Sequence, residues 1–123
     1  MTTYKVLIAE DNQFIGSLIA KILSELNIEN TIVHTGSDVL AAYNKDYYDM
    51  VLLDIMMPQM SGLQVSKEIR KTNSHIPIVA LTSIPFAEIE DELASSGINH
   101  YITKPPKAQE LQNLLKEYFK SAA

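Results

Sequence analysis

The stretch VLLDIMMPQMSG (residues 51–62) joins an apolar run directly to an acidic residue. Val51, Leu52 and Leu53 lead into Asp54, and a Met-Met-Pro turn follows at once. A run that is apolar at successive positions is typical of a strand in a parallel sheet with helices on both faces. Asp54 is therefore expected at the exposed carboxyl end of a buried strand, where other polar groups of the chain can meet it.

Similar short apolar runs alternate with helical patterns along the chain. Strands are predicted at residues 5–9 (KVLIA), 30–34 (NTIVH), 50–54 (MVLLD), 78–82 (IVALT) and 101–103 (YIT). Strand–helix units in this succession predict a single α/β domain with one five-stranded parallel sheet and helices on both faces. In such a sheet, ligands bind beyond the carboxyl ends of the strands.

The predicted helices carry apolar residues at three-to-four spacing, as helices that pack on a sheet do. The first helix has a wide apolar stripe from Phe14 to Leu26, and the stripe of the fourth helix starts at Phe86. Ser61 is the expected start signal of the third helix, and Gly97 the expected stop signal of the fourth.

Size and composition limit the classes of protein to consider. A chain of 123 residues corresponds to about one domain. The absence of Cys excludes disulfides and thiolate metal sites. With 10 basic and 15 acidic residues, the net charge of −5 argues against direct nucleic-acid binding. Neither a signal peptide nor an apolar run of about 20 residues is visible, so we expect a cytoplasmic protein without membrane contact.

Polar residues follow several of the predicted strands. Glu10 and Asp11 come after the first strand, Asp54 ends the third, Thr82 ends the fourth, and Lys104 follows the fifth. Because the carboxyl ends of parallel strands lie at the same edge of a sheet, these five side chains are expected to converge. Taken singly, each has an ordinary explanation as a cap, a turn former, a strand-end residue or a solvated charge. Their joint placement indicates a site.

The chemistry of this set favours phosphoryl transfer with a divalent cation. Three adjacent carboxylates repel one another, and one takes up a proton unless a cation lies among them. Oxygen ligands of this kind suit Mg²⁺, or Mn²⁺ in its place. Asp54 can then act as the nucleophile toward phosphorus and form an aspartyl phosphate. Lys104 and the hydroxyl of Thr82 are placed to contact the phosphoryl oxygens.

The chain resembles the receiver domains of the two-component response-regulator family. The matching segments are IAEDN (8–12), LLDIMMPQMSG (52–62), IVALTS (78–83), SGINHYITKP (96–105) and the closing helix. The ordered set spans essentially the whole chain and is far more specific than any one segment. The resemblance implies a receiver domain over residues 1–123, with a doubly wound (βα)5 flavodoxin-like fold and strand order 2-1-3-4-5.

The resemblance also implies the role of each site residue. Asp54 would be the phosphoacceptor, supplied by the phosphohistidine of a histidine kinase or a histidine phosphotransfer protein. Glu10 and Asp11 would hold Mg²⁺ together with Asp54 and the main-chain carbonyl of Met56. Lys104 would contact the phosphoryl group. Such a protein is a phosphoacceptor that assists its own phosphorylation and slow dephosphorylation, rather than an enzyme.

Further residues match the switching parts of the family. The Lys104–Pro105 bond is expected to be cis, Thr82 corresponds to the switching hydroxyl, and Tyr101 to the aromatic residue that moves with it. Their movement would reach a downstream protein target at the face formed by the fourth helix, the fifth strand and the fifth helix. Pro85 is a departure from the family; it is expected either to open the fourth helix or to stiffen the loop after Thr82.

Met56 and Ile84, two residues after Asp54 and Thr82, are apolar at positions that influence hydrolysis in this family. We hypothesise that they shield the aspartyl phosphate from water. Met56 also argues against an aspartyl-nucleophile phosphohydrolase, which usually has a second Asp at that position as its general acid. A purely structural interaction domain is disfavoured because no site residue is missing.

Two further alternatives concern the turn after the first strand and the extent of the protein. A nucleotide-binding module would have a Gly-rich turn there, whereas this chain has Glu10 and Asp11. The sequence is compatible with a stand-alone response regulator. The alternative is a receiver domain excised from a hybrid histidine kinase or from a longer response regulator.

Overall fold

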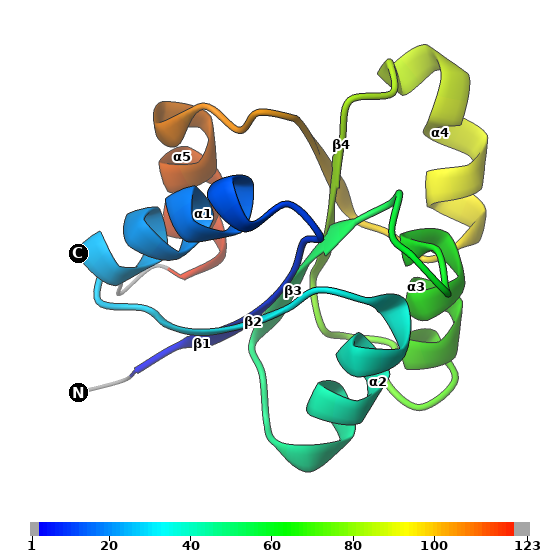
Figure 1. Ribbon diagram of the computed structural model, residues 1–123, viewed down its shortest axis with the longest axis horizontal. Helices are drawn as coiled ribbons and strands as arrows, with labels where there is room; N and C mark the ends of the chain where they lie inside the picture. The colour runs from blue at the N-terminus through cyan, green and yellow to red at the C-terminus, as the bar shows by residue number, and fades with distance from the viewer. Residues whose placement is uncertain (1–2, 120–123) are drawn as a thin grey trace.

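The computed structural model describes residues 3–119, in which five strands and five helices alternate (Figure 1). The strands are β1 (Lys5–Ala9), β2 (Glu29–Val33), β3 (Met50–Asp54), β4 (Ile78–Thr82) and β5 (His100–Thr103). The helices are α1 (Gln13–Glu25), α2 (Gly36–Lys45), α3 (Gly62–Arg70), α4 (Phe86–Ser95) and α5 (Ala108–Tyr118).

The strands form one parallel sheet with the order β2-β1-β3-β4-β5, which confirms the predicted topology. From β1 the chain first goes outward to β2 and then returns to β3 on the other side of β1. The carboxyl ends of β1 and β3 are therefore the topological switch point, where ligands bind in open α/β sheets. Asp54, the last residue of β3, lies at this point and pairs with Leu81 of β4.

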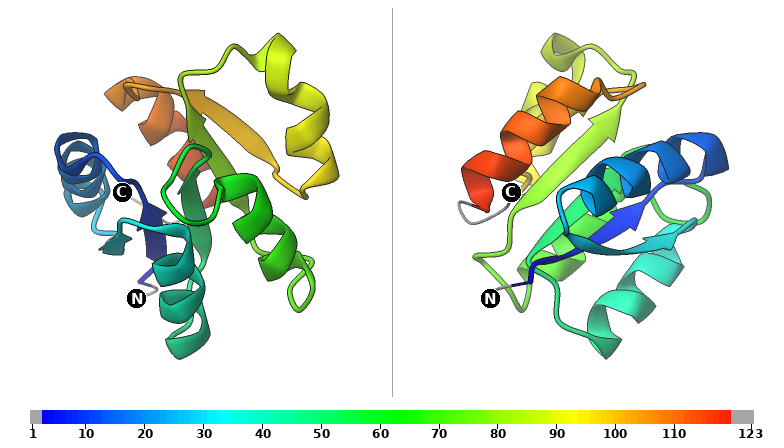
Figure 2. Two further views of the ribbon diagram at one scale, coloured as in Figure 1. Left: turned by 45° about the vertical axis from the view of Figure 1, so that its right-hand side comes forward. Right: turned by 90° about the vertical axis from the view of Figure 1, so that its left-hand side faces the viewer.

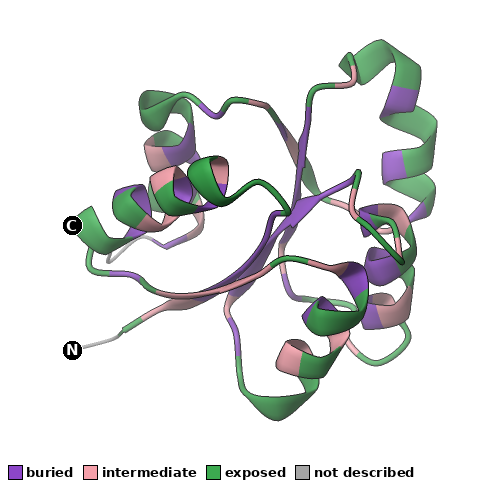
Figure 3. Cartoon of the chain, viewed as in Figure 1, coloured by how far each residue is buried: buried purple, intermediate pink, exposed green. Residues whose placement is uncertain are grey.

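Helices cover both faces of the sheet, as predicted. Helices α1 and α5 lie on one face, and α2, α3 and α4 lie on the other (Figures 1 and 2). The three inner strands are buried throughout except at Lys5 (Figure 3). Ile19, Leu23 and Leu115 are fully buried between the first face and its helices. Burying each such side chain contributes about 1.5–3 kcal/mol, so the amphipathic stripes hold the helices on the sheet.

Strand boundaries agree with the prediction at the centre of the sheet and shift at its edges. The bounds of β1, β3 and β4 are those predicted. Strand β2 begins and ends one residue earlier, because the amide of Glu29 already bonds the carbonyl of Tyr4, 2.9 Å away. Strand β5 begins one residue earlier, where His100 pairs with Val79. The helix signals are confirmed, since Ser61 caps α3 and Gly97 follows α4 with φ of +81°.

The two phenylalanines at the starts of the predicted apolar stripes are exposed. Phe14 is 79% exposed and Phe86 is 46% exposed. Each lies in the first turn of a helix, at the carboxyl end of the sheet, and the buried positions begin only after it. Pro85 precedes the first residue of α4 instead of lying within its first turn, and it provides no side-chain cap.

No helix within residues 3–119 is both long enough and apolar enough to cross a membrane.

Candidate functional site

Three carboxylates meet at the switch point. Glu10 follows β1 and Asp54 ends β3, and both side chains are fully buried, whereas Asp11 is exposed. One oxygen from each of the three groups can be chosen so that all lie within 4.8 Å of one another. The structure therefore brings together the acidic residues that the sequence placed at the carboxyl ends of two different strands.

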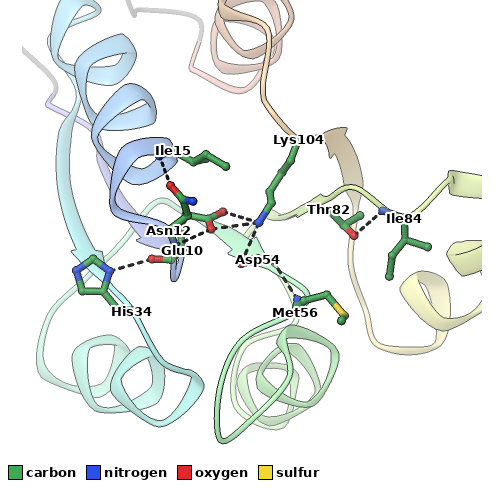
Figure 4. Close-up of polar contacts among 9 residues, drawn as sticks. All are labelled: Glu10, Asn12, Ile15, His34, Asp54, Met56, Thr82, Ile84 and Lys104. Carbon is green, nitrogen blue, oxygen red and sulfur yellow. Dashed lines mark hydrogen bonds and ion pairs between the residues drawn. The ribbon is translucent and has the colours of Figure 1, made fainter.

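Lys104 completes this cluster from the loop that follows β5. Its Nζ lies 3.1 Å from each carboxylate oxygen of Glu10 and 3.1 Å from Asp54 Oδ2 (Figure 4). The Lys104–Pro105 peptide bond is cis, as expected. Because a buried charge is costly unless it is paired, the single ammonium and the two buried carboxylates depend on one another.

Local hydrogen bonds hold the acidic turn after β1. The amide of Asn12 donates to Glu10 Oε2 over 3.0 Å, and the side chain of Asn12 caps α1 by accepting from the amide of Ile15 over 2.9 Å. Nδ1 of His34 lies 2.9 Å from the carbonyl oxygen of Glu10 (Figure 4). Asn12 thus has the capping role typical of its residue type, while the contact of His34 left no signal in the sequence.

The loop after Asp54 folds closely back onto β3. The amide of Met56 donates to Asp54 Oδ1 over 3.0 Å, and the amide of Gly62 donates to the carbonyl of Ile55 over 2.9 Å. A Cβ at Gly62 would lie 2.3 Å from the carbonyl oxygen of Asp54, so only glycine fits there. Within residues 3–119, the buried Oδ2 of Asp54 accepts no hydrogen bond and is met only by the ion pair with Lys104.

The electrostatics of the cluster favour a proton or a cation among the carboxylates. Burial is the main cause that raises the pKa of Asp54 to about 7. The proton that Asp54 can share with Asp11 and the charge of Glu10 raise this pKa further, whereas Lys104 lowers it. The same shared proton lowers the pKa of Asp11. Burial lowers the pKa of Lys104, but its contacts with Glu10 and Asp54 outweigh burial and leave that pKa raised.

The residues present fit a divalent cation. Three hard oxygen donors, one of them exposed to solvent, match the preference of Mg²⁺ for carboxylates together with retained waters, and Mn²⁺ accepts similar ligands. In the part of the chain that the structure describes, the buried Oδ2 of Asp54 is ion-paired with Lys104 but accepts no hydrogen bond, so it has coordination capacity to spare. The Glu10–Asp11–Asp54 cluster can therefore hold a metal ion.

Thr82 and Tyr101 are joined through a residue that the sequence did not single out for that role. Oγ1 of Thr82 accepts from the amide of Ile84 over 3.0 Å, and the hydroxyl of Tyr101 donates to the carbonyl of Ile84 over 2.6 Å. The ring of Tyr101 also meets Phe86 edge-on, with 5.3 Å between ring centroids. Thr82 lies on the strand next to Asp54, so the backbone of Ile84 links the rim of the site to α4 and β5.

A doubly wound parallel sheet with a basic and three acidic side chains at its switch point defines the class of CheY-like α/β domains. The family described as the response regulator receiver domain matches residues 6–116. The chain belongs to this family, which serves two-component signal transduction.

Relatives and solved structures agree with this assignment. The chain is 34% identical to hybrid signal transduction histidine kinase L of Dictyostelium discoideum, over 95% of this chain and 7% of that protein. It is 37% identical to the transcriptional regulatory protein YkoG of Bacillus subtilis, over 86% of this chain and 46% of that one. The chain thus spans less than half the length of these relatives, which belong to two different kinds of signalling protein.

Two solved structures share the fold. The chemotaxis response regulator CheY4 of Vibrio cholerae superposes with a TM-score of 0.90 and 26% identity, covering 95% of this chain and 99% of that one. The receiver domain of sensor histidine kinase PA1611 of Pseudomonas aeruginosa gives a TM-score of 0.87 and 29% identity, covering 98% and 100%. The latter structure has a magnesium ion coordinated in its active site cleft.

Proposed function

We propose that this chain is a phosphorylation-dependent switch in which Asp54 accepts a phosphoryl group from the phosphohistidine of a histidine kinase or a histidine phosphotransfer protein. The observation that carries the proposal is the placement of Asp54, a fully buried carboxylate whose Oδ2 is ion-paired with Lys104. The match to the receiver family supports this reading over a phosphohydrolase, for which the chain lacks an acid at Met56.

The chemical step is a transfer between two nucleophiles. A carboxylate oxygen of Asp54 forms a bond to phosphorus, while the bond between phosphorus and the imidazole nitrogen breaks and its electrons stay on the imidazole. Lys104 already contacts Asp54, so it can neutralise a phosphoryl oxygen without leaving the site. Asp54 must be ionised to react, and its raised pKa makes the reaction depend on charge neutralisation nearby.

Mg²⁺ is the cation that we propose for the site, with Mn²⁺ as a substitute. The carboxylates of Glu10, Asp11 and Asp54 and the main-chain carbonyl of Met56 would hold it. When bound, it would supply the positive charge that offsets the three carboxylates and the incoming phosphoryl oxygens.

The switch would run from Thr82 to the face of α4, β5 and α5, where we propose that a downstream protein binds. The hydroxyl of Thr82 can donate to a phosphoryl oxygen while it continues to accept from Ile84. A shift of Thr82 would move Ile84 and, through its carbonyl, Tyr101. A phosphoryl group adds about −1.5 to −2 charges at one point, so it can bias two packings of this loop.

The lifetime of the phosphoryl group would depend on Met56 and Ile84. Met56 is 65% exposed and its side chain points away from Asp54 (Figure 4), so shielding requires it to turn over the phosphoryl group. Comparing dephosphorylation of the wild type with a Met56→Asn, Ile84→Glu variant tests the idea. We expect faster loss of the phosphoryl group in the variant; equal rates would refute the shielding role.

The proposed function is tested by incubation with acetyl phosphate and Mg²⁺, followed by intact mass measurement. We expect the mass of one phosphoryl group to be gained by the wild type and not by Asp54→Ala. Lys104→Ala should bind Mg²⁺ yet gain the phosphoryl group much more slowly. A wild-type protein that binds Mg²⁺ without any mass gain would overturn the phosphoacceptor role.

A further inference from the structure

His34 lies directly after β2 and contacts the acidic turn that follows β1. The residue is exposed, and its Nδ1 lies 2.9 Å from the carbonyl oxygen of Glu10 (Figure 4). A carbonyl oxygen can only accept a hydrogen bond, so Nδ1 must carry a proton and donate it. The contact therefore fixes which nitrogen of the imidazole is protonated, and it ties β2 to the backbone of the turn.

This hydrogen bond holds the peptide unit that joins Glu10 to Asp11. The amide of Glu10 continues the ladder between the strands by donating to the carbonyl of Val33 over 3.0 Å. Within residues 3–119, the carbonyl of Glu10 accepts from no backbone amide, and His34 is its hydrogen-bond partner. A peptide unit is planar, so a fixed carbonyl oxygen also fixes the direction in which the chain enters Asp11.

The Asp11 carboxylate depends on this backbone more than the other two carboxylates of the cluster do. Glu10 is held through its side chain, since Oε2 accepts from the amide of Asn12 over 3.0 Å and both oxygens lie 3.1 Å from Lys104. Asp54 is buried and paired with Lys104 over 3.1 Å. Asp11 is exposed, and among the described residues its carboxylate forms no such ion pair and meets no amide of another residue. Its direction therefore follows from where its backbone lies.

His34 itself is not placed to bind the metal ion. Among the described residues, the cluster of possible ligands consists of Glu10, Asp11 and Asp54 and does not include His34. The imidazole also turns Nδ1 to a carbonyl, and Mg²⁺ prefers oxygen ligands to nitrogen. Any effect of His34 on the metal site must therefore pass through the Glu10–Asp11 peptide.

We propose that His34 is a positioning residue of the metal site, whose Nδ1–H holds the Glu10–Asp11 peptide so that the Asp11 carboxylate faces those of Glu10 and Asp54. The inference rests on the proposed function only for the choice of Mg²⁺ as the ion. Residues that hold ligands without touching the metal typically change metal affinity by about tenfold to a hundredfold. Because a single neutral hydrogen bond is involved here, we expect an effect of about threefold to tenfold.

Calorimetric titration of the metal-free protein with Mg²⁺ tests this role at pH 8, where Asp54, with its pKa of about 7, is mostly ionised. His34→Leu keeps a side chain of similar size without the donor and should raise the Kd for Mg²⁺ about threefold to tenfold. His34→Asn should bind Mg²⁺ within about twofold of the wild type, because its amide nitrogen is bonded to Cγ as Nδ1 is and can donate in its place.

Further measurements separate positioning from a purely structural role. The matched control His75→Leu removes another exposed imidazole, in the loop before β4, and should leave the Kd for Mg²⁺ unchanged. Nitrogen-15 spectra of the metal-free wild type should show the imidazole proton of His34 on Nδ1. Phosphoryl uptake from acetyl phosphate by His34→Leu should be slow at low Mg²⁺ and return to within about twofold of the wild-type rate at saturating Mg²⁺.

Several results would overturn the inference: an unchanged Kd in His34→Leu, equal weakening in His34→Asn, equal weakening in His75→Leu, or a neutral imidazole of His34 protonated on Nε2. The last is read from the wild type, so it holds even where a variant fails to fold. The two proposals remain distinguishable. Weaker Mg²⁺ binding in His34→Leu, with no uptake by the wild type, refutes the proposed function and leaves the role of His34 standing. Uptake at Asp54 with equal Mg²⁺ binding in all variants refutes the role of His34 alone.

Discussion

Helices α3 and α4 lie side by side on one face of the sheet but are attached to it differently (Figure 2). Helix α3 has a side-chain cap from Ser61, and Gly62 at its start packs directly on the backbone of Asp54. Helix α4 begins after Pro85 without a side-chain cap, and its first residue, Phe86, is 46% exposed. Two helices of similar length thus differ in how firmly their first turns are held.

The carboxyl end of α4, in contrast to its first turn, is held by side chains of α3. Ser66 of α3 donates to the carbonyl of Ser96 over 2.6 Å in a buried hydrogen bond, and Arg70 donates to the carbonyl of Gly97 over 2.9 Å. Helix α4 is therefore fixed at its carboxyl end and loosely held at the end that follows Thr82. The difference indicates that the Asp54 side of the site is a rigid support, whereas the Thr82 side can move.

The largest effect is expected where the start of α3 packs on the end of β3, at Gly62. Gly62→Ala places a Cβ 2.3 Å from the carbonyl oxygen of Asp54, and backbone cannot yield as a side chain can. We expect a loss of more than about 3 kcal/mol in the free energy of unfolding, measured with urea. The control Ala87→Gly, in the first turn of α4, should cost about 1 kcal/mol or less. Similar losses in both variants would contradict the comparison.

The next effect is the pH dependence of the metal-free protein. Asp54 has a pKa of about 7 in the folded state, above its ordinary value, so its contribution to stability is present at acid pH and is lost as pH rises through 7. The lowered pKa of Asp11 gives a stabilisation that is lost only as pH falls below its ordinary value of 3.8, so it adds nothing to the change between pH 5 and 8. We expect a net loss of about 2 kcal/mol between pH 5 and 8.

Urea unfolding in EDTA at both pH values measures this difference, and the variant Asp54→Asn is the control. The variant should lose most of the dependence and be the more stable protein at pH 8. Added Mg²⁺ should restore stability to the wild type at pH 8, because it binds the ionised carboxylates. An unchanged pH dependence in Asp54→Asn would show that other groups cause it.

A smaller effect is expected at the carboxyl end of α4, where Ser66 of α3 holds the backbone. Ser66→Ala removes the donor to the buried carbonyl of Ser96 and should cost about 1–2 kcal/mol. Amide hydrogen exchange should accelerate most at the carboxyl end of α4. The neighbouring exposed Lys67→Ala is the control, with an expected change within about 0.5 kcal/mol. Exchange that accelerates first near Phe86 would argue against the anchor.

The smallest effect concerns the amino-terminal end of α4, which has no side-chain cap. Tyr101→Phe removes the partly buried hydrogen bond to the carbonyl of Ile84. We expect a stability change below about 1 kcal/mol together with faster backbone exchange at Ile84. Phosphoryl uptake at Asp54 should be unchanged, because Tyr101 lies outside the acidic cluster. A change in uptake would show that Tyr101 also shapes the reacting groups.

The sequence predicted most of this architecture where burial leaves a clear pattern. The runs of β1, β3 and β4 are apolar at successive positions, and their ends were predicted to the residue. The edge strands β2 and β5 are partly exposed; both ends of β2 and the start of β5 lie one residue earlier than predicted. The convergence of Glu10, Asp11, Asp54 and Lys104 followed from the geometry of parallel strands alone.

Other features left no signal in the sequence. The link between Thr82 and Tyr101 uses backbone atoms of Ile84, which any residue would supply. Helical periodicity gives the buried face of a helix but does not say where the sheet beneath it ends. Phe14 and Phe86 therefore belong to the predicted apolar stripes and yet are exposed.

The most direct test of the account is a crystal structure of the protein with Mg²⁺ and beryllofluoride, a mimic of the phosphoryl group. We expect beryllium bonded to a carboxylate oxygen of Asp54, the metal held by Glu10, Asp11 and Asp54, and fluorines in contact with Lys104 Nζ and Thr82 Oγ1. The end of α4 near Phe86 should shift while α3 stays in place. Beryllofluoride bound elsewhere, or Lys104 remaining only with Glu10, would contradict the account.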